Sequence, residues 1–177
     1  MFRQCFLIVV VMILQEHALL KGASISSGYT CRHGFIRLNE GCYLFENTHP
    51  ATWTEAQNYC LNFGAKLVSV ESAEEHRAIR SHIMKYSSAF PLKGLWTSGN
   101  DIVHHGRWEW ASTLTPIGPF TAWGTGEPSK PDPRYPEQHC LQYFTYAHYV
   151  YQWDNFDCSK KMHFICEQGA EPSVIGL

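Results

Sequence analysis

At 177 residues the chain has room for one domain with short appendages, and a second domain of ordinary size does not fit. Its formal net charge of -2 provides no basic field for phosphates or an anionic bilayer, so nucleic acid and polybasic membrane attachment are excluded from the expected functions. An aromatic content of 14% indicates a packed core or a recognition surface and argues against disorder.

The N-terminal segment has the features of a secretory signal peptide. Met1 and Arg3 precede an apolar run from Cys5 to Leu14, and small residues follow from Gly22. A run of about ten apolar residues is shorter than the roughly twenty that a membrane-spanning helix needs, so no membrane insertion is expected, and a weakly cleaved anchor is the alternative. We predict a signal peptide over residues 1–24, cleaved at about residues 24–26, and a secreted, extracellular protein.

The first structural elements are a strand pair and a helix. Residues 34–45 carry the pattern of two strands around a turn, and we expect the domain to start there. Thr52 followed by Glu55 is a capping box, and apolar residues then recur with helical spacing. The pattern predicts a helix over residues 53–62.

A strand and a second helix come next. Residues 65–70 read Ala-Lys-Leu-Val-Ser-Val, which predicts a short buried strand. Ser72 with Glu75 forms a second capping box, and it opens a helix that ends near Lys85.

The second half of the chain differs in composition from the first. Residues 92–137 are rich in Gly, Pro and Trp without helical period, which predicts a long structured loop region of the kind that carries function. Residues 139–153 and 162–167 are strand-like, and residues 168–177 form a short polar tail. Two helices with strands at both ends predict an α+β domain whose ends pair in one sheet.

Cysteine usage is typical of an oxidising compartment. Cleavage of the leader removes Cys5 and leaves an even number of cysteines, so three disulfides are expected, although spacing alone selects no pairing. A metal centre is disfavoured, because no C-x2-C pair and no H-E-x-x-H pair occurs; we interpret His104 and His105 as surface or hydrogen-bonded residues. Without a G-x-S-x-G elbow or a zinc-protease helix, we expect no enzyme.

Residues spread along the chain follow the order of one known family. They are Cys60 within the first helix, Gly94-Leu95-Trp96, Asn100 before Gly106, Trp108 and Trp110, Trp123 before Glu127-Pro128, Trp153-Asp154-Asn155, and the closing Cys158 and Cys166. Together they resemble the C-type lectin-like domain over residues 31–167. The resemblance implies two helices, antiparallel sheets, a long loop region and the disulfides Cys31–Cys42, Cys60–Cys166 and Cys140–Cys158.

The resemblance also implies a calcium site that binds carbohydrate. The family uses a Glu-Pro-Asn or Gln-Pro-Asp triplet whose proline is typically cis, a Glu before the third core cysteine, and a Trp-Asn-Asp triplet. The matching residues, expected to bind both Ca2+ and sugar, are Glu127, Ser129, Glu137, Asp154 and Asn155, with Gln138 as the alternative to Glu137.

The sequence departs from the family pattern at several of these positions. Ser129 stands where the family has an amide or carboxylate, and Asp154 and Asn155 are in swapped order, which preserves the total charge. The interval between Glu127 and Cys140 is longer than usual, so the triplet at residues 130–132 is an alternative, although it places a lysine where a ligand belongs.

These expectations define a secreted, calcium-dependent lectin. Its partners are expected to be glycans, mannose-like or broad in class, with a role in innate immune recognition as the family analogy. Because single sites of this kind bind monosaccharides weakly, a homo-oligomer is a further hypothesis. The alternative is a calcium-independent domain of the same fold that binds a protein partner or an extracellular matrix surface.

Overall fold

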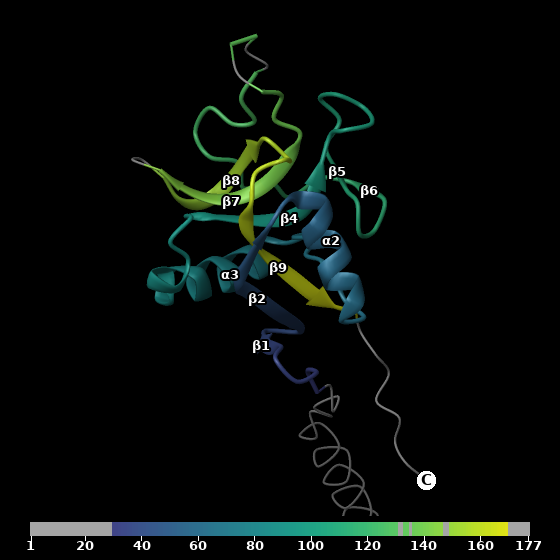
Figure 1. Ribbon diagram of the computed structural model, residues 1–177, viewed down its shortest axis with the longest axis vertical. Helices are drawn as coiled ribbons and strands as arrows, with labels where there is room; N and C mark the ends of the chain where they lie inside the picture. The colour runs from purple at the N-terminus through teal and green to yellow at the C-terminus, as the bar shows by residue number, and fades with distance from the viewer. Residues whose placement is uncertain (1–29, 131–132, 135, 147–148, 170–177) are drawn as a thin grey trace, which may run out of the picture. The chain divides into compact units, whose positions relative to one another are not determined.

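The computed structural model describes residues 30–130, 133–134, 136–146 and 149–169, and the signal-peptide prediction falls outside them. Cys31–Ala170 form one compact unit (Figure 1). Its elements are β1 (Ile36–Leu38), β2 (Gly41–Ala51), α2 (Trp53–Asn62), β3 (Lys66–Leu67), α3 (Ala73–Lys85), the 3-10 turn η1 (Ser87–Ala89), β4 (Gly94–Asn100), β5 (Glu109–Trp110), β6 (Thr115–Pro116), β7 (Cys140–Tyr146), β8 (Tyr149–Phe156) and β9 (Met162–Gln168).

The last strand of the domain, β9, organises the sheet. It pairs antiparallel with β2 and β3 and parallel with β4, so strands from the two ends of the domain lie side by side, as expected. The expectation of antiparallel pairing is therefore corrected for the β4–β9 pair. Strand β4 also pairs with β7, and β7 pairs with β8, which extends the sheet into the second half of the domain (Figure 1).

The first helix is the one that the sequence predicts. Thr52 and Glu55 form both hydrogen bonds of the capping box, and α2 buries Trp53, Ala56 and Cys60. The Trp53 indole Nε1 donates to the Thr97 carbonyl at 2.8 Å, which attaches the start of the helix to β4.

The second helix begins with only half of its expected capping box. The Ser72 hydroxyl accepts from the Glu75 amide at 3.1 Å. The Glu75 carboxylate does not complete the box, because it accepts from the Glu71 amide at 3.0 Å and from the Tyr43 hydroxyl at 2.7 Å. Ile79 and Ile83 are buried.

Two segments differ from the expected elements. The strand expected over residues 65–70 pairs only over Lys66–Leu67. The loop region expected over residues 92–137 begins with β4, whose seven residues are all buried. A fully buried strand lacks the alternation of polar and apolar residues by which a half-exposed strand is recognised. The small residues of β4 made this strand still harder to recognise in the sequence.

All three disulfides of the family pattern are present, namely Cys31–Cys42, Cys60–Cys166 and Cys140–Cys158. The Cys60–Cys166 bond joins α2 to β9 and closes a separation of 106 residues. In the loop-entropy description, such a closure restricts the unfolded chain by up to about 4–5 kcal/mol.

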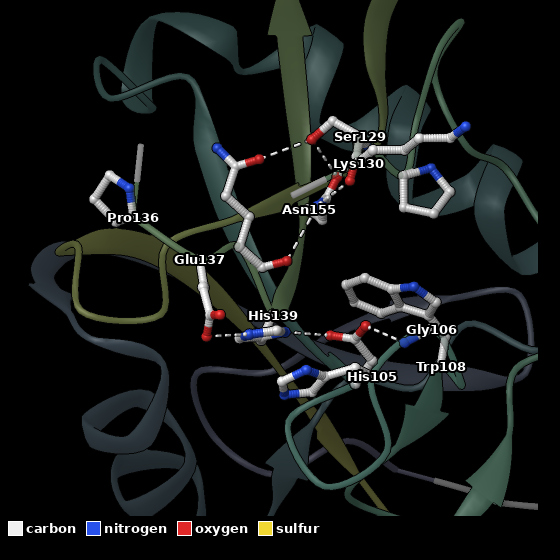
Figure 2. A pocket seen from close by; sticks show the side chains of 12 residues that line it. His105, Gly106, Trp108, Ser129, Lys130, Pro136, Glu137, His139 and Asn155 are labelled. Atoms are coloured by element: carbon white, nitrogen blue, oxygen red, sulfur yellow. Dashed lines mark hydrogen bonds and ion pairs between the residues drawn. The ribbon is translucent and has the colours of Figure 1, made fainter. Parts of the chain in front are cut away.

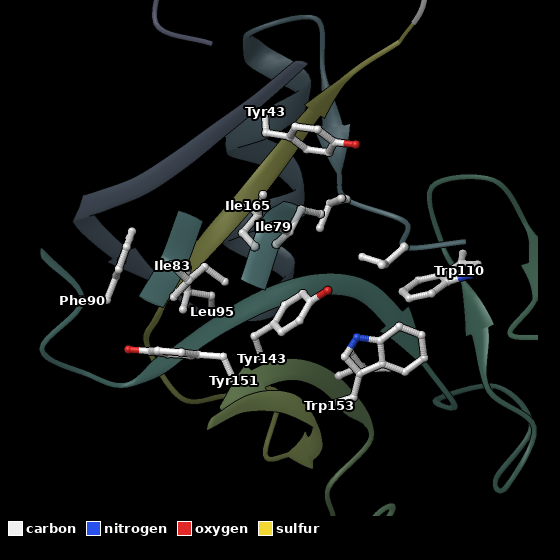
Figure 3. Packing of buried hydrophobic residues seen from close by; sticks show 13 residues of the cluster. Tyr43, Ile79, Ile83, Phe90, Leu95, Trp110, Tyr143, Tyr151, Trp153 and Ile165 are labelled. Atoms are coloured by element: carbon white, nitrogen blue, oxygen red, sulfur yellow. The ribbon is translucent and has the colours of Figure 1, made fainter. Parts of the chain in front are cut away.

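The core lies between α3 and the β4–β7–β8 strands (Figure 3). Trp110 and Trp153 are fully buried and meet edge to face, with ring centroids 5.5 Å apart. Trp108 and Trp123 are partly buried and pack against this cluster. The core thus extends from α3 to the loops that precede β7, and those loops pack against it.

Replacement of Thr52 by Ala tests the cap of α2. The substitution removes the hydroxyl that accepts from the Glu55 amide, and we expect unfolding to require about 1 kcal/mol less. Urea denaturation measures the change. Thr54→Ala is the matched control, since Thr54 is exposed inside the same helix and alanine is the better helix former there. A loss of stability as large for Thr54→Ala would contradict the assignment.

Candidate functional site

The β7–β8 pair forms the base of the site. Gln142 lies opposite Asp154 in the antiparallel register, and its amide Nε2 donates to Asp154 Oδ2 at 2.9 Å. The Cys140–Cys158 disulfide joins the start of β7 to the residues that follow β8. Asp154 and the adjacent Asn155 are both buried, and they lie near the end of β8 that the disulfide restrains.

The loop before Glu127 is bonded to the same strand. The Trp153 amide donates to the Ala122 carbonyl at 2.9 Å, and the Gly124 amide donates to the Trp153 carbonyl at 2.8 Å. The Glu127 amide then donates to the Gly124 carbonyl at 3.0 Å. The Glu127–Pro128 peptide bond is cis. These bonds place Glu127 close to Asp154, the residue that follows Trp153.

The carboxylates of Glu127 and Asp154 lie next to each other. Burial raises the pKa of the Asp154 carboxyl to about 7, the hydrogen bond from Gln142 opposes the rise, and the charge and side-chain hydrogen bond of Glu127 add to it. Two carboxyl groups in contact favour a shared proton or a bound cation, because two negative charges at this distance repel each other.

Ser129 lies at the centre of the remaining oxygens. Its amide donates to Glu127 Oε2 and to Asn155 Oδ1, each at 2.7 Å. Its hydroxyl donates to Gln138 Oε1 at 2.8 Å and lies 3.1 Å from Asn155 Oδ1. The Asn155 amide Nδ2 donates to the carbonyls of Ser129 and Gln138. Three side-chain oxygens from three segments thus converge on one residue.

The two candidates for the middle ligand have different neighbours. Gln138 contacts Ser129, whereas Glu137 Oε2 lies 3.0 Å from His139 Nε2. Residues 136–139 have no helical or turn structure, and in an extended chain successive side chains point to opposite sides. Glu137 and His139 therefore share one side, and Gln138 takes the other.

A second polar cluster surrounds His139. Its Nδ1 lies 2.8 Å from Asp101 Oδ1, and its ring stacks on that of His105 with centroids 4.3 Å apart. Burial lowers the pKa of His139, but the hydrogen bonds with Glu137 and Asp101 raise it above its ordinary value. His105 is exposed, in agreement with its interpretation as a surface or hydrogen-bonded residue, but its contact with His139 was not foreseen. The spacing Glu137-x-His139 was the signal that could have located this cluster.

One pocket of about 500 Å³ is lined by Ser129, Gln138 and Asn155 and by the cluster around His139. Glu127 and Asp154 are not among its lining residues. Figure 2 shows Ser129 and Asn155 on one side of it and Glu137, His139 and His105 on the other. Lys130 also lines the pocket. Of the alternative triplet at residues 130–132, only Lys130 belongs to the described residues.

The oxygen donors fit a hard divalent cation. Calcium takes six to eight oxygen ligands from carboxylates, amide carbonyls and hydroxyl or water oxygens. Glu127 and Asp154 supply carboxylates, Gln138 and Asn155 supply amide oxygens, and Ser129 supplies a hydroxyl. A divalent ion would offset the repulsion between the two carboxylates.

A mixed sheet with two helices, three disulfides and a cluster of oxygen donors under the loops defines a disulfide-stabilised binding domain of the C-type lectin-like fold. Residues 49–168 match the family model described as Lectin C-type domain, so the chain belongs to the C-type lectin domain family. This is a family of binding domains, which agrees with the expectation that the chain is not an enzyme.

Similar proteins cover most of the domain. Perlucin from Haliotis laevigata is 29% identical over 147 residues, which is 83% of this chain and 88% of that protein. Lithostathine-1-beta from Homo sapiens is 30% identical over 139 residues, or 78% of each. Among solved structures, the SPL-1–GlcNAc complex has a TM-score of 0.64 at 29% identity and covers 78% of this chain and 94% of that one.

Within the described residues, neither α2 nor α3 nor any other helix has the length and apolar character needed to cross a bilayer.

Proposed function

We propose that this chain is a secreted lectin that binds glycans through a calcium ion held by Glu127, Ser129, Gln138, Asp154 and Asn155. The observation that carries the proposal is the contact between the Glu127 and Asp154 carboxylates beside the amide oxygens around Ser129. Gln138 replaces Glu137 in the expected ligand set, because its side chain reaches Ser129.

Calcium supplies two open coordination positions for adjacent hydroxyl groups of a sugar. The chain supplies the side-chain oxygens around these two positions. Glu127 Oε2 and Asn155 Oδ1 both accept from the Ser129 amide, so these two oxygens lie side by side and can also accept hydrogen bonds from those hydroxyls. The pocket beside them has room for a monosaccharide and the start of a longer glycan.

The proposed sugar class is mannose-like or broad. A Glu-first triplet favours neighbouring equatorial hydroxyls, but Ser129 lacks the amide that sharpens this choice. The SPL-1 structure is described as a complex with GlcNAc, which supports carbohydrate binding by a relative at 29% identity. A role in innate immune recognition and display of several copies together are parts of the same proposal, since single sites bind monosaccharides weakly.

Calcium is expected to stabilise the protein. At about 1 mM calcium and a dissociation constant of about 0.1 mM, the gain in unfolding free energy is about 1.4 kcal/mol, a few degrees in Tm. Asp154→Asn should raise Tm in chelator, because it removes the buried one of two adjacent carboxylates, and should lose most of the gain from calcium. Differential scanning calorimetry with and without EDTA measures both. An unchanged Tm of the wild type on calcium addition would contradict the ion site.

The middle ligand can be identified by a pair of substitutions. Gln138→Ala removes an oxygen next to Ser129, and we expect it to weaken calcium binding by about tenfold. Glu137→Gln should leave calcium affinity unchanged, because that side chain faces His139. Calorimetric titration with calcium compares the two variants. The opposite result would return Glu137 to the ligand set.

Sugar binding is tested on mannose and galactose columns. The wild type is expected to be retained on mannose in calcium and released by EDTA, and Glu127→Gln should pass through in both conditions. Lys161→Ala, at an exposed lysine that does not line the pocket, is the control and should be retained. Retention that EDTA does not disturb would show sugar binding without calcium.

A calcium-independent binding domain for a protein or matrix surface is the second candidate. One observation favours it: Ser129 already donates to oxygens of Glu127, Asn155 and Gln138, so these groups are satisfied without an ion. Absence of both calcium binding and column retention would favour this candidate.

A further inference from the structure

The second polar cluster of the pocket has the composition of a transition-metal site. One ligand atom each from His105, Glu137 and His139 lies within 4.8 Å of the other two. Two imidazole nitrogens and one carboxylate oxygen are donors that suit Zn2+, whereas calcium takes oxygen ligands. We propose that His105, Glu137 and His139 bind a zinc ion that is separate from the proposed calcium site.

The central ligand, His139, is already oriented for metal binding. Asp101 Oδ1 lies 2.8 Å from Nδ1, so when Nδ1 carries the proton, Nε2 presents its lone pair to Glu137 and the pocket. A carboxylate that holds the far nitrogen of a ligating histidine is the usual second partner in zinc sites, where it sets the tautomer and the ring orientation.

Asp101 is itself held firmly. Its side chain is 9% exposed, and its Oδ2 accepts from the Gly106 amide at 2.7 Å. Its own amide donates to the His139 carbonyl at 3.1 Å. Asp101 thus holds both the backbone of His139 and the loop that carries His105. The positions of these two segments are therefore set before any ion binds.

The remaining adjustment is small. Ligands of a tetrahedral zinc ion lie about 3.3 Å apart when each is about 2.0–2.1 Å from the metal. His139 Nε2 and Glu137 Oε2 are 3.0 Å apart. His105 stacks on His139 and must turn its ring to direct a nitrogen at the same point, which its exposure permits. All three residues line the pocket, so water there could complete the coordination of a bound ion.

An ion pair alone would not need all of these residues. A protonated His139 between Asp101 and Glu137 is satisfied without metal. To that ion pair the stacked imidazole of His105 contributes a charge effect that helps to lower the pKa of the Glu137 carboxyl, whereas in a metal site it supplies the third ligand. The contribution of His105 therefore separates the two explanations.

Isothermal titration of the purified, tag-free protein with zinc chloride tests the proposal. We expect saturable binding of one zinc per chain, weakened at least about tenfold by His105→Ala and by Glu137→Gln. His104→Ala is the control, because His104 is an exposed neighbour outside the cluster, and it should bind as the wild type does. Equal Tm values of the metal-free variants would show that the fold is intact.

The same titration in saturating calcium keeps the two sites distinguishable. Gln138→Ala and Asp154→Asn should retain full zinc affinity, even if they lose calcium, because their side chains do not belong to the cluster. No saturable zinc binding by the wild type, or binding that both His105→Ala and Glu137→Gln leave unchanged, would overturn the proposal. The cluster would then be an ion pair only.

Discussion

The backbone hydrogen bonds between Trp153 and residues 122–124 are the constraint on which the site depends. They join the loop that carries Glu127 to the strand that carries Asp154, and the buried Trp153 ring holds that strand on the core. The Cys140–Cys158 disulfide restrains the C-terminal end of the same strand. Because both restraints act on backbone, the two carboxylates are brought together against their own repulsion, and the core provides the stabilisation that offsets it.

Much of the fold could be predicted from the sequence, because its signals are local. The cap formed by Thr52 and Glu55 located α2 to the residue, and the family pattern gave all three disulfide pairings. The parallel pairing of β4 with β9 could not be predicted in this way. Register between strands far apart in sequence is set by tertiary packing, and the uniform burial of β4 erased the periodicity that would have marked its faces.

The site was predictable in part. The structure brings Glu127, Ser129, Asp154 and Asn155 together, as the resemblance implied, but whether they bind calcium stays a prediction. The choice between Glu137 and Gln138 depended on which way an irregular segment turns before Cys140, and no sequence pattern determines that. The Asp101–His139–Glu137 cluster was missed because Asp101 is far from the other two in sequence and the Glu137-x-His139 spacing matches no established motif.

The alternation of residues 137–139 has a consequence for how this domain can evolve. The side chain of Gln138 faces Ser129, whereas the side chain of His139 faces Asp101. A one-residue insertion or deletion before the disulfide at Cys140 would exchange the two sets of donors, while single substitutions would alter one set and spare the other. Selection should therefore tolerate change in the composition of this segment more readily than change in its length.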